Sequence, residues 1–222
     1  MGDPMDAPMS GVGAQASDWH VYEPRLGHGL AHDPFNAIVA PRPIGWIATH
    51  DGQGHHNLAP YSFCNAFNYV PPIVGFASLG RKDTLRNIER TGEFVWNVVS
   101  EPLAQAMNTS CAAVPPEVDE FALASLDWLP ARHVQARRVA LSPAQFECRV
   151  TQIVPLQTAQ GDTLPTWLVL GEVVCVHLHR STLADGRFHT LSAQPVLRGG
   201  GGGDYFTLSP GGHFHMSRPG ST

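Results

Sequence analysis

PRPIGWIATHDGQGHHNLAPYSFCNAFNYVPPIVGFASLGRKDT, residues 41–84, is the stretch that decides the fold. In residues 41–49, β-branched and aromatic residues follow two prolines, which predicts a strand entered from a fixed turn, with Arg42 at its mouth. DGQG at 51–54 predicts a hairpin turn, and residues 57–65 predict the returning strand. Small and hydrogen-bonding side chains alternate with apolar ones there, so we expect this strand to bring backbone amides close to a ligand.

The end of the same stretch predicts an anion site. Arg81 and Lys82 precede a helical pattern, and Asp83 or Thr84 is a suitable N-cap residue. The free amides of a first helical turn carry partial positive charge and Lys82 adds a full one, so a phosphate would be held well. The alternative is that these residues form a solvated turn and a capped helix with no ligand.

Seven segments in this order resemble the flavin reductase-like, FMN-binding split-barrel family, which includes the reductase components of two-component flavin monooxygenases. The segments are PRPIGWIAT at 41–49, NLAPYSF at 57–63, KDT at 82–84, EFVWN at 93–97, DEF at 119–121, GEVV at 171–174 and RGGGGGDY at 198–205. The resemblance extends from about residue 33 to residue 206.

The resemblance implies a mainly β protein, a single antiparallel split β-barrel with Greek-key connections and short peripheral helices, and FMN at a subunit interface. It places the domain at residues 19–206, after a disordered segment at 1–18 and before a C-terminal tail at 207–222. The strand-like runs 93–99, 145–154 and 167–178 fit a barrel, and the last two are expected to form a hairpin.

The resemblance also assigns cofactor-binding residues position by position. The phosphate and ribityl chain are assigned to Arg42, Ser62, Lys82 and Thr84, with Asp83 at the helix start. The residues around the ring are Ala48, Thr49, Asn57, Ala59, Tyr61, Phe63 and Asn65. The sequence departs from the family at Cys64, where a bulkier apolar residue is usual, and at residues 136–138, where a proline is expected.

Five glycines at 199–203 have two interpretations. They could be a flexible linker, because ordering glycine is entropically costly. The family pattern favours a backbone that passes closely over a flat ring, framed by Arg198 and Tyr205.

Composition limits the alternatives. The chain has 222 residues, 43% of them hydrophobic, and a net charge of −5, so we expect one sizeable core and no nucleic-acid or membrane partner. We predict that the protein is cytoplasmic and that its cysteines are reduced core residues, namely Cys64, Cys111, Cys148 and Cys175. His177 and His179 share one strand face, but no third ligand of fixed spacing follows, so we predict no metal site.

The function expected from the resemblance is NAD(P)H:flavin oxidoreduction that supplies reduced flavin or electrons to a partner such as a monooxygenase. No Rossmann or P-loop motif occurs, so NADH or NADPH must bind without a domain of its own. No acid–base dyad or catalytic triad is evident, and the catalytic residues stay unknown. The alternative is tightly bound FMN in an oxidase, electron carrier or flavin-binding protein; a heme- or pyridoxal-phosphate-binding relative is more distant.

A homodimer is expected, because the family closes its site that way and the apolar runs at 94–99 and 169–176 exceed the needs of one small barrel.

Overall fold

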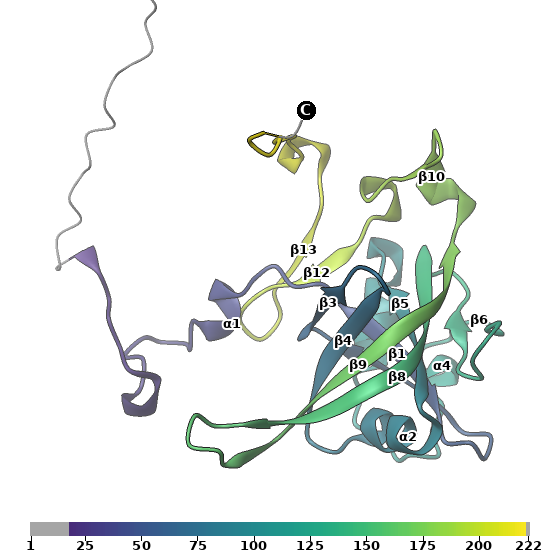
Figure 1. The fold of residues 1–222 in the computed structure, drawn as a ribbon, viewed down its shortest axis with the longest axis horizontal. Coiled ribbons are helices and arrows are strands. Elements are labelled where there is room, and N and C mark those ends of the chain that lie inside the picture. Colours follow the sequence, from purple (N-terminus) through teal and green to yellow (C-terminus); the bar gives the residue numbers. More distant parts are fainter. Residues whose placement is uncertain (1–17, 221–222) are drawn as a thin grey trace, which may run out of the picture.

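The computed structural model describes residues 18–220, so the first seventeen residues, with most of the expected disordered segment, lie outside the described part. One antiparallel sheet of seven strands in the order β2-β1-β5-β8-β9-β4-β3 forms the body of the protein (Figure 1). The strands are β1 (Gly45–His50), β2 (His56–Tyr61), β3 (Cys64–Asn68), β4 (Ile73–Leu79), β5 (Glu93–Val98), β8 (Ala144–Gln157) and β9 (Thr163–Leu178).

Short elements surround this sheet. The α-helices are α1 (Phe35–Ile38), α2 (Asp83–Thr91), α3 (Ala104–Thr109) and α4 (Glu120–Leu123). Three short strand pairs accompany them: β6 (Trp128–Leu129) with β7 (Arg138–Val139), β10 (Leu183–Ala184) with β11 (Arg187–Phe188), and β12 (Val196–Arg198) with β13 (Tyr205–Thr207). The expected hairpin of the second half is confirmed, since β8 and β9 pair along most of their length.

The sheet curls into a barrel because its two edge strands are neighbours in the chain. β2 and β3 lie at opposite ends of the strand order, yet only residues 62 and 63 separate them. The backbone amide of Ala77 donates to the carbonyl of Phe63 over 2.8 Å, which ties this connection to β4. A flat sheet of this order could not be joined by two residues, so curling is required. The predicted mainly β, antiparallel split barrel is confirmed.

Two buried clusters stabilise the barrel. One lies between the barrel strands and α2, which buries Leu85 and Ile88 from its inward face. The other lies where β1 and β5 pack against the segments that carry α3 and α4, around the fully buried Trp46. β5 contributes to both clusters because its residues alternate between the two faces. The strand predicted from residues 93–99 is confirmed, with both faces buried.

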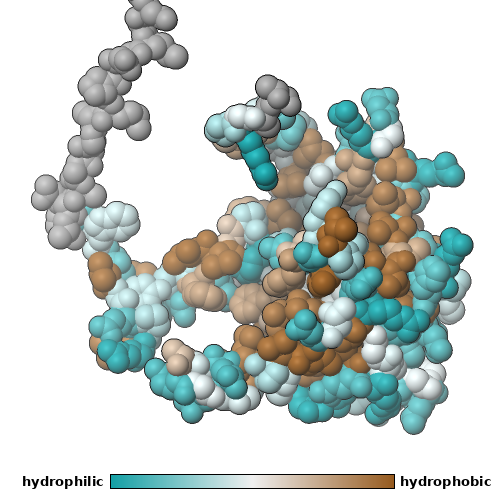
Figure 2. Space-filling model, in the orientation of Figure 1, coloured by the Kyte–Doolittle hydropathy of each residue, from teal (hydrophilic) through white to brown (hydrophobic). Residues whose placement is uncertain are grey.

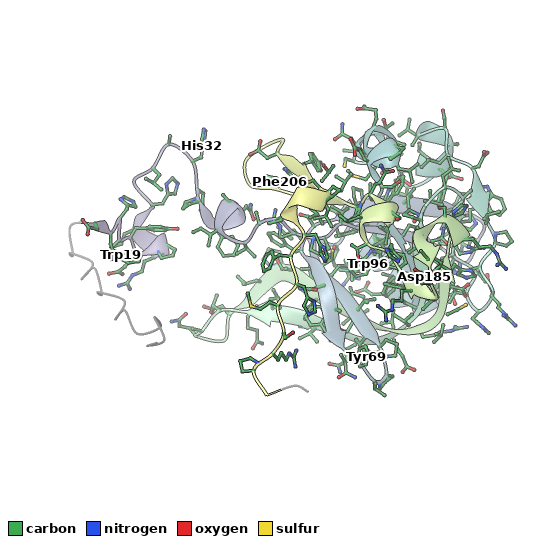
Figure 3. The ribbon with its side chains drawn as sticks, turned by 90° about the horizontal axis from the view of Figure 1, so that it is seen from above. Trp19, His32, Tyr69, Trp96, Asp185 and Phe206 are labelled. Carbon is green, nitrogen blue, oxygen red and sulfur yellow. The ribbon has the colours of Figure 1, made fainter. Side chains whose placement is uncertain are left out.

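An arm at residues 18–40 and a tail after β13 extend from the barrel (Figure 1, Figure 3). The arm carries exposed apolar side chains, among them Trp19, which is 68% exposed. Backbone hydrogen bonds between Arg42 and Arg198, of 2.9 and 2.8 Å, join the start of β1 to β12. Among residues 18–220, no helix has the length and apolar character needed to cross a membrane.

Candidate functional site

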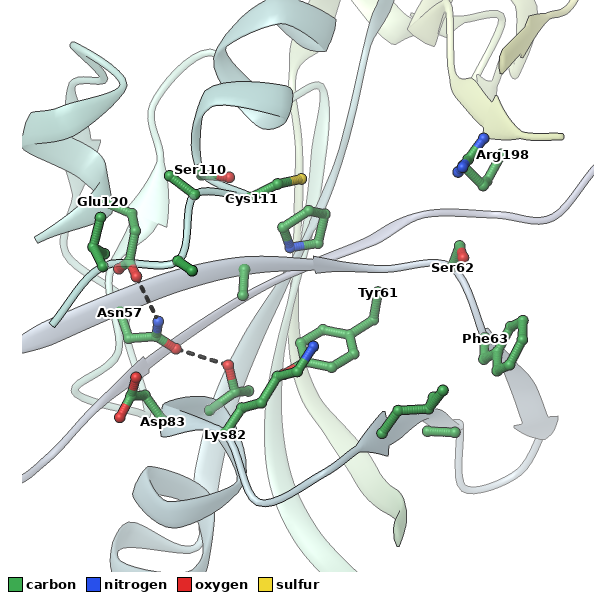
Figure 4. Close-up of a pocket in the computed structure, with 18 of the residues that line it drawn as sticks. Asn57, Tyr61, Ser62, Phe63, Lys82, Asp83, Ser110, Cys111, Glu120 and Arg198 are labelled. Carbon is green, nitrogen blue, oxygen red and sulfur yellow. Dashed lines mark hydrogen bonds between the residues drawn. The ribbon is translucent and has the colours of Figure 1, made fainter. Parts of the chain in front are cut away.

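A cavity of about 680 Å³ opens beside the first turn of α2 (Figure 4). Its volume lies within the range of about 300–1,000 Å³ that is typical of small-molecule sites. The wall comes from β2, the connection to β3, the end of β4, the start of α2, residues 110–114 and the β12–β13 loop. Ten residues predicted from the sequence line it, namely Arg42, Asn57, Ala59, Tyr61, Ser62, Phe63, Lys82, Asp83, Thr84 and Arg198.

Four predicted residues do not line this cavity. Ala48 and Thr49 lie on β1 with no exposed surface, behind the cavity wall. Asn65 lines a neighbouring groove of about 540 Å³. The ring of Tyr205 lies against the guanidinium of Arg198, 4.8 Å from centroid to Cζ. Thr49 still contributes indirectly, because its hydroxyl donates to the Asn57 side-chain oxygen over 3.2 Å.

The start of α2 differs from the prediction in its cap. The N-cap residue is Lys82, not Asp83 or Thr84, and no side chain caps the first turn. Asp83 pairs with Arg86, and the Thr84 hydroxyl donates to Asn57. Both predicted capping side chains therefore have other partners, which leaves the first-turn amides of α2 available to a ligand.

Lys82 is the only lysine in the chain. Its side chain lines the cavity and is exposed (Figure 4), and within residues 18–220 its ammonium group makes no hydrogen bond or ion pair. The only ε-amino group of the protein therefore faces the candidate site without a protein partner, beside uncapped helix amides. This combination is suited to an anion.

A buried polar network supports the same wall, and sequence reasoning missed its central residue. The Glu120 carboxylate, 6% exposed, accepts from the Asn57 side-chain amide and the Leu58 backbone amide, both at 3.0 Å. Asn57 in turn accepts from Thr84 over 2.7 Å (Figure 4). Burial raises the pKa of Glu120 above its ordinary value, against the effect of its hydrogen bonds. The sign of Glu120 in the sequence was the DEF motif at 119–121, one of the segments that carry the family resemblance.

The two arginines of the site are held by backbone carbonyls. Arg42 is 8% exposed and donates to the carbonyls of Asn36, Val39 and Gly199. Arg198 donates to the carbonyls of Asp204, Gly201 and Gly202. Both cations therefore order the chain around the cavity and contribute positive potential, while their donors are largely occupied.

The glycine run forms an ordered loop between β12 and β13. A Cβ atom at Gly200 would lie 2.5 Å from the Ala37 Cβ, so Gly200 is packed against α1. A Cβ at Gly202 or Gly203 would meet no atom within 4 Å. The interpretation as a free linker is wrong for this segment, because Arg198 closes the loop. Only its tip is open.

Residues 110–114 form the wall opposite α2, and no motif in the sequence analysis pointed to them. The Trp46 indole donates to the Ser110 hydroxyl over 2.9 Å, which fixes this segment to the barrel core. Cys111 follows it and is exposed in the cavity, so the prediction that it is a core residue is wrong. All four cysteines are free, and Cys64 and Cys148 are buried as predicted.

Among the described residues of the wall, two buried atoms lack a partner, Arg42 Nε and the Tyr61 hydroxyl oxygen. The Tyr61 hydroxyl lies near the Thr84 and Ser78 side chains but makes no hydrogen bond of good geometry within the described residues, although the residue is only 7% exposed. Burial raises the pKa of Tyr61, so the group is a neutral donor at neutral pH. An unpaired buried hydroxyl costs about 1–3 kcal/mol, and a polar ligand atom would satisfy it. The donors Tyr61, Ser62 and Lys82 thus fit a flavin nucleotide that has a polar chain and a phosphate.

Comparison with known proteins matches this architecture. Residues 39–192 match the model of the flavin reductase like domain. The chain belongs to this family. An uncharacterised protein of Halalkalibacterium halodurans is 36% identical over 166 residues, which cover 72% of this chain and 78% of that protein.

Solved structures agree with this assignment. Nitrilotriacetate monooxygenase component B from Bacillus cereus superimposes with a TM-score of 0.75 at 27% identity, over 84% of this chain and 98% of that one. A protein of Shewanella frigidimarina described as having a split barrel domain superimposes with a TM-score of 0.72 at 21% identity, over 82% and 90%. The protein is thus a flavin reductase-like split barrel, and its chemistry is flavin-related oxidoreduction.

Proposed function

We propose that the protein is an NAD(P)H:flavin oxidoreductase that binds FMN in the cavity beside α2. The observation that carries the proposal is the position of Lys82, the only lysine, whose exposed ammonium faces the cavity at an uncapped helix N-terminus. A phosphate dianion there would accept from the ammonium and from first-turn amides. FAD, which lacks a terminal phosphate, could not use this arrangement in the same way.

The remaining wall suits the ring and the ribityl chain. The Ser62 and Tyr61 hydroxyls are donors for the chain or the ring edge, and the backbone from Ala59 to Phe63 supplies further polar groups. When bound, the isoalloxazine accepts hydride from a nicotinamide, and the protein supplies orientation and hydrogen bonds. Hydride transfer of this kind does not require an acid–base dyad from the protein.

Within residues 18–220 the barrel carries no separate dinucleotide-binding domain, so in this proposal the nicotinamide approaches the flavin directly. The open tip of the β12–β13 loop, at Gly202 and Gly203, leaves room on one side of the cavity. Hydride transfer requires close approach of donor and acceptor atoms, so an uncovered face is needed. Arg198 is the cation in the wall on that side, and it contributes positive potential for the nicotinamide's own phosphates while its guanidinium donates to the loop carbonyls.

Anaerobic mixing of the protein and FMN with NADH or NADPH tests this function. We expect bleaching of the oxidised flavin absorbance with one nicotinamide preferred. Absence of reduction by either nicotinamide within minutes would contradict the reductase assignment. In that case FMN that stays bound through gel filtration would support the alternative of a carrier or oxidase.

We further propose that two copies form a dimer. A groove of about 540 Å³ between the arm and the barrel is lined by Phe35, Ile38, Phe63 and Phe67, and Figure 2 shows apolar surface that continues from the arm onto the barrel. The reasoning from residues 94–99 was wrong, because β5 is buried within one chain. Val174 and Val176 on β9 are 39% and 50% exposed and support the proposal. Sedimentation at micromolar concentration tests it, and a monomer with full flavin occupancy would exclude it.

The supply of reduced flavin or electrons to a monooxygenase is part of the same proposal. It is supported by the likeness to a monooxygenase component B, which covers nearly all of that chain. A cytoplasmic location is also proposed, because the four cysteines are free, and Cys111 is exposed. Coupled turnover with a flavin-dependent monooxygenase, compared with chemically reduced FMN, would measure transfer.

A further inference from the structure

We infer that Glu147, Cys175 and His177 form a binding site for a thiophilic divalent cation of the zinc class, separate from the flavin cavity. One ligand atom from each residue, a carboxylate oxygen, Sγ and an imidazole nitrogen, lies within 4.8 Å of the others. None of the three residues lines the cavity beside α2. The prediction of no metal site rested on His177 and His179, which lack a third ligand of fixed spacing; it did not consider Cys175 on the same strand and Glu147 on the adjacent one.

The barrel places these side chains on one face of the β8–β9 pair. Glu147 is directly opposite Cys175 in the ladder, and His177 follows two residues later on β9. Directly opposite residues in an antiparallel pair point to the same side, as do residues two apart. A β-bulge at Val174 shifts the register immediately before Cys175. Bulges change the direction of side chains next to sites, and here the bulge brings Cys175 opposite the glutamate.

The distances are close to those of a zinc centre. Cys175 Sγ and His177 Nε2 are 3.6 Å apart. Tetrahedral zinc with Zn–S of about 2.3 Å and Zn–N of about 2.0–2.1 Å separates the two atoms by about 3.6 Å. His177 Nε2 is 2.5 Å from Glu147 Oε1. For both atoms to bind one zinc ion, the distance between them must increase by about 1 Å. Rotation of the partly exposed His177 ring supplies that movement.

The carboxylate is already oriented for such a role. Glu147 has no exposed surface, and its two oxygens accept from the backbone amides of Arg132 and His133 at 2.7 and 2.6 Å. Hydrogen bonds of this kind fix a ligating carboxylate in metal sites. Cys175 and His177 are partly exposed, so an ion can enter and a water can complete the coordination. Three protein ligands with one open position are characteristic of non-structural zinc sites.

The same geometry argues against a cysteine nucleophile activated by the histidine. His177 Nε2 faces both the Glu147 carboxylate and the Cys175 sulfur, so one ring nitrogen would have to serve both partners. A relay requires the two different ring nitrogens for these roles. A metal ion resolves this arrangement, because Nε2 then binds the ion together with the sulfur and the oxygen, and the proton resides on Nδ1. Thiolate, imidazole and carboxylate together favour zinc over magnesium or calcium.

Cobalt(II) titration of the untagged, full-length protein freed of metal tests the inference. We expect one equivalent per chain and a thiolate-to-cobalt charge-transfer band, with zinc displacing the cobalt. Cys175→Ser should abolish the band, and His177→Gln should weaken cobalt binding at least tenfold. Cys111→Ser, which alters the exposed cysteine of the other site, should leave the band unchanged.

Two outcomes would overturn the inference. One is a spectrum without a charge-transfer band, and the other is a band that persists in Cys175→Ser. Circular dichroism of Cys175→Ser, which removes no buried hydrogen-bond donor to Glu147, separates loss of a ligand from loss of the fold. If the flavin assays fail while cobalt binds as expected, the proposed reductase function fails alone.

Discussion

Replacement of Lys82 by alanine tests the phosphate assignment most directly. The change removes the only ε-ammonium group of the chain, from an exposed position on the cavity wall. Two unit charges about 4 Å apart interact by about 4 kcal/mol at an effective dielectric constant of 20 and by about 1 kcal/mol in water. Because Lys82 is exposed, we take about 1.5–3 kcal/mol, the range of a hydrogen bond to a charged group. FMN affinity should therefore fall by about one to two powers of ten.

Quenching of flavin fluorescence measures this effect for FMN and riboflavin in parallel. Riboflavin lacks the phosphate, so its affinity for Lys82→Ala should barely change. The matched control is Arg81→Ala, which removes an adjacent cation that pairs with Glu89 and lies outside the cavity. Reductive methylation adds an independent measurement, because FMN should protect the only lysine and riboflavin should not. Equal losses of affinity for the two flavins would refute the reasoning.

Three further changes test other parts of the structure. Burial lowers the pKa of His56 from 6.5 to about 4, and the charge of Arg137 adds to this effect. The unprotonated His56 therefore contributes its full stabilisation above pH 6.5, and the contribution is lost as the pH falls to about 4. Allowing for partial exposure, the loss is about 1–2 kcal/mol, and urea unfolding should show it in the wild type but not in His56→Gln. Gly171→Ala would place a Cβ 2.6 Å from Phe94 and should cost about 1–3 kcal/mol in the same assay; a change below about 0.5 kcal/mol would contradict the packing. Gly202→Val should slow reduction by NAD(P)H in stopped-flow mixing and leave FMN affinity unchanged, and unaltered reduction would place the nicotinamide elsewhere.

The individual strands could be predicted because they have strong local signals, whereas the barrel was predicted from the family resemblance. Residues 41–49 and 93–99 combine β-branched and aromatic residues with bounding turns, and the structure has strands in both places. Residues 57–65 were predicted as one returning strand, but the structure divides them at Ser62 and Phe63 into β2 and β3, and this short connection makes the sheet curl. Nine of the ten predicted cavity residues lie within residues 41–84, because a ligand wall built from one hairpin and the next helix start is contiguous in sequence.

The remaining wall depends on long-range packing, which has no local pattern. Glu120 enters the site only because α4 packs against β2, where its carboxylate accepts from the Asn57 side-chain amide. The capping prediction failed because the helix begins at Asp83. Thr84 therefore lies inside the first turn, and its hydroxyl donates to Asn57 on β2.

The proposed cation site shows that long-range contacts also decide what a sheet brings together. Spacing along the strand pairs His177 with His179, and a search for a third ligand at a fixed distance in sequence then finds nothing. Glu147, the proposed ligand beside Cys175 and His177, is about thirty residues away in the chain. It lies directly opposite Cys175 in the ladder, in a register that the bulge at Val174 sets. A register change of one residue would turn the glutamate to the other face of the sheet. The site therefore depends on the bulge as much as on its ligands, and deletion of Val174 should abolish cobalt binding without altering any ligand.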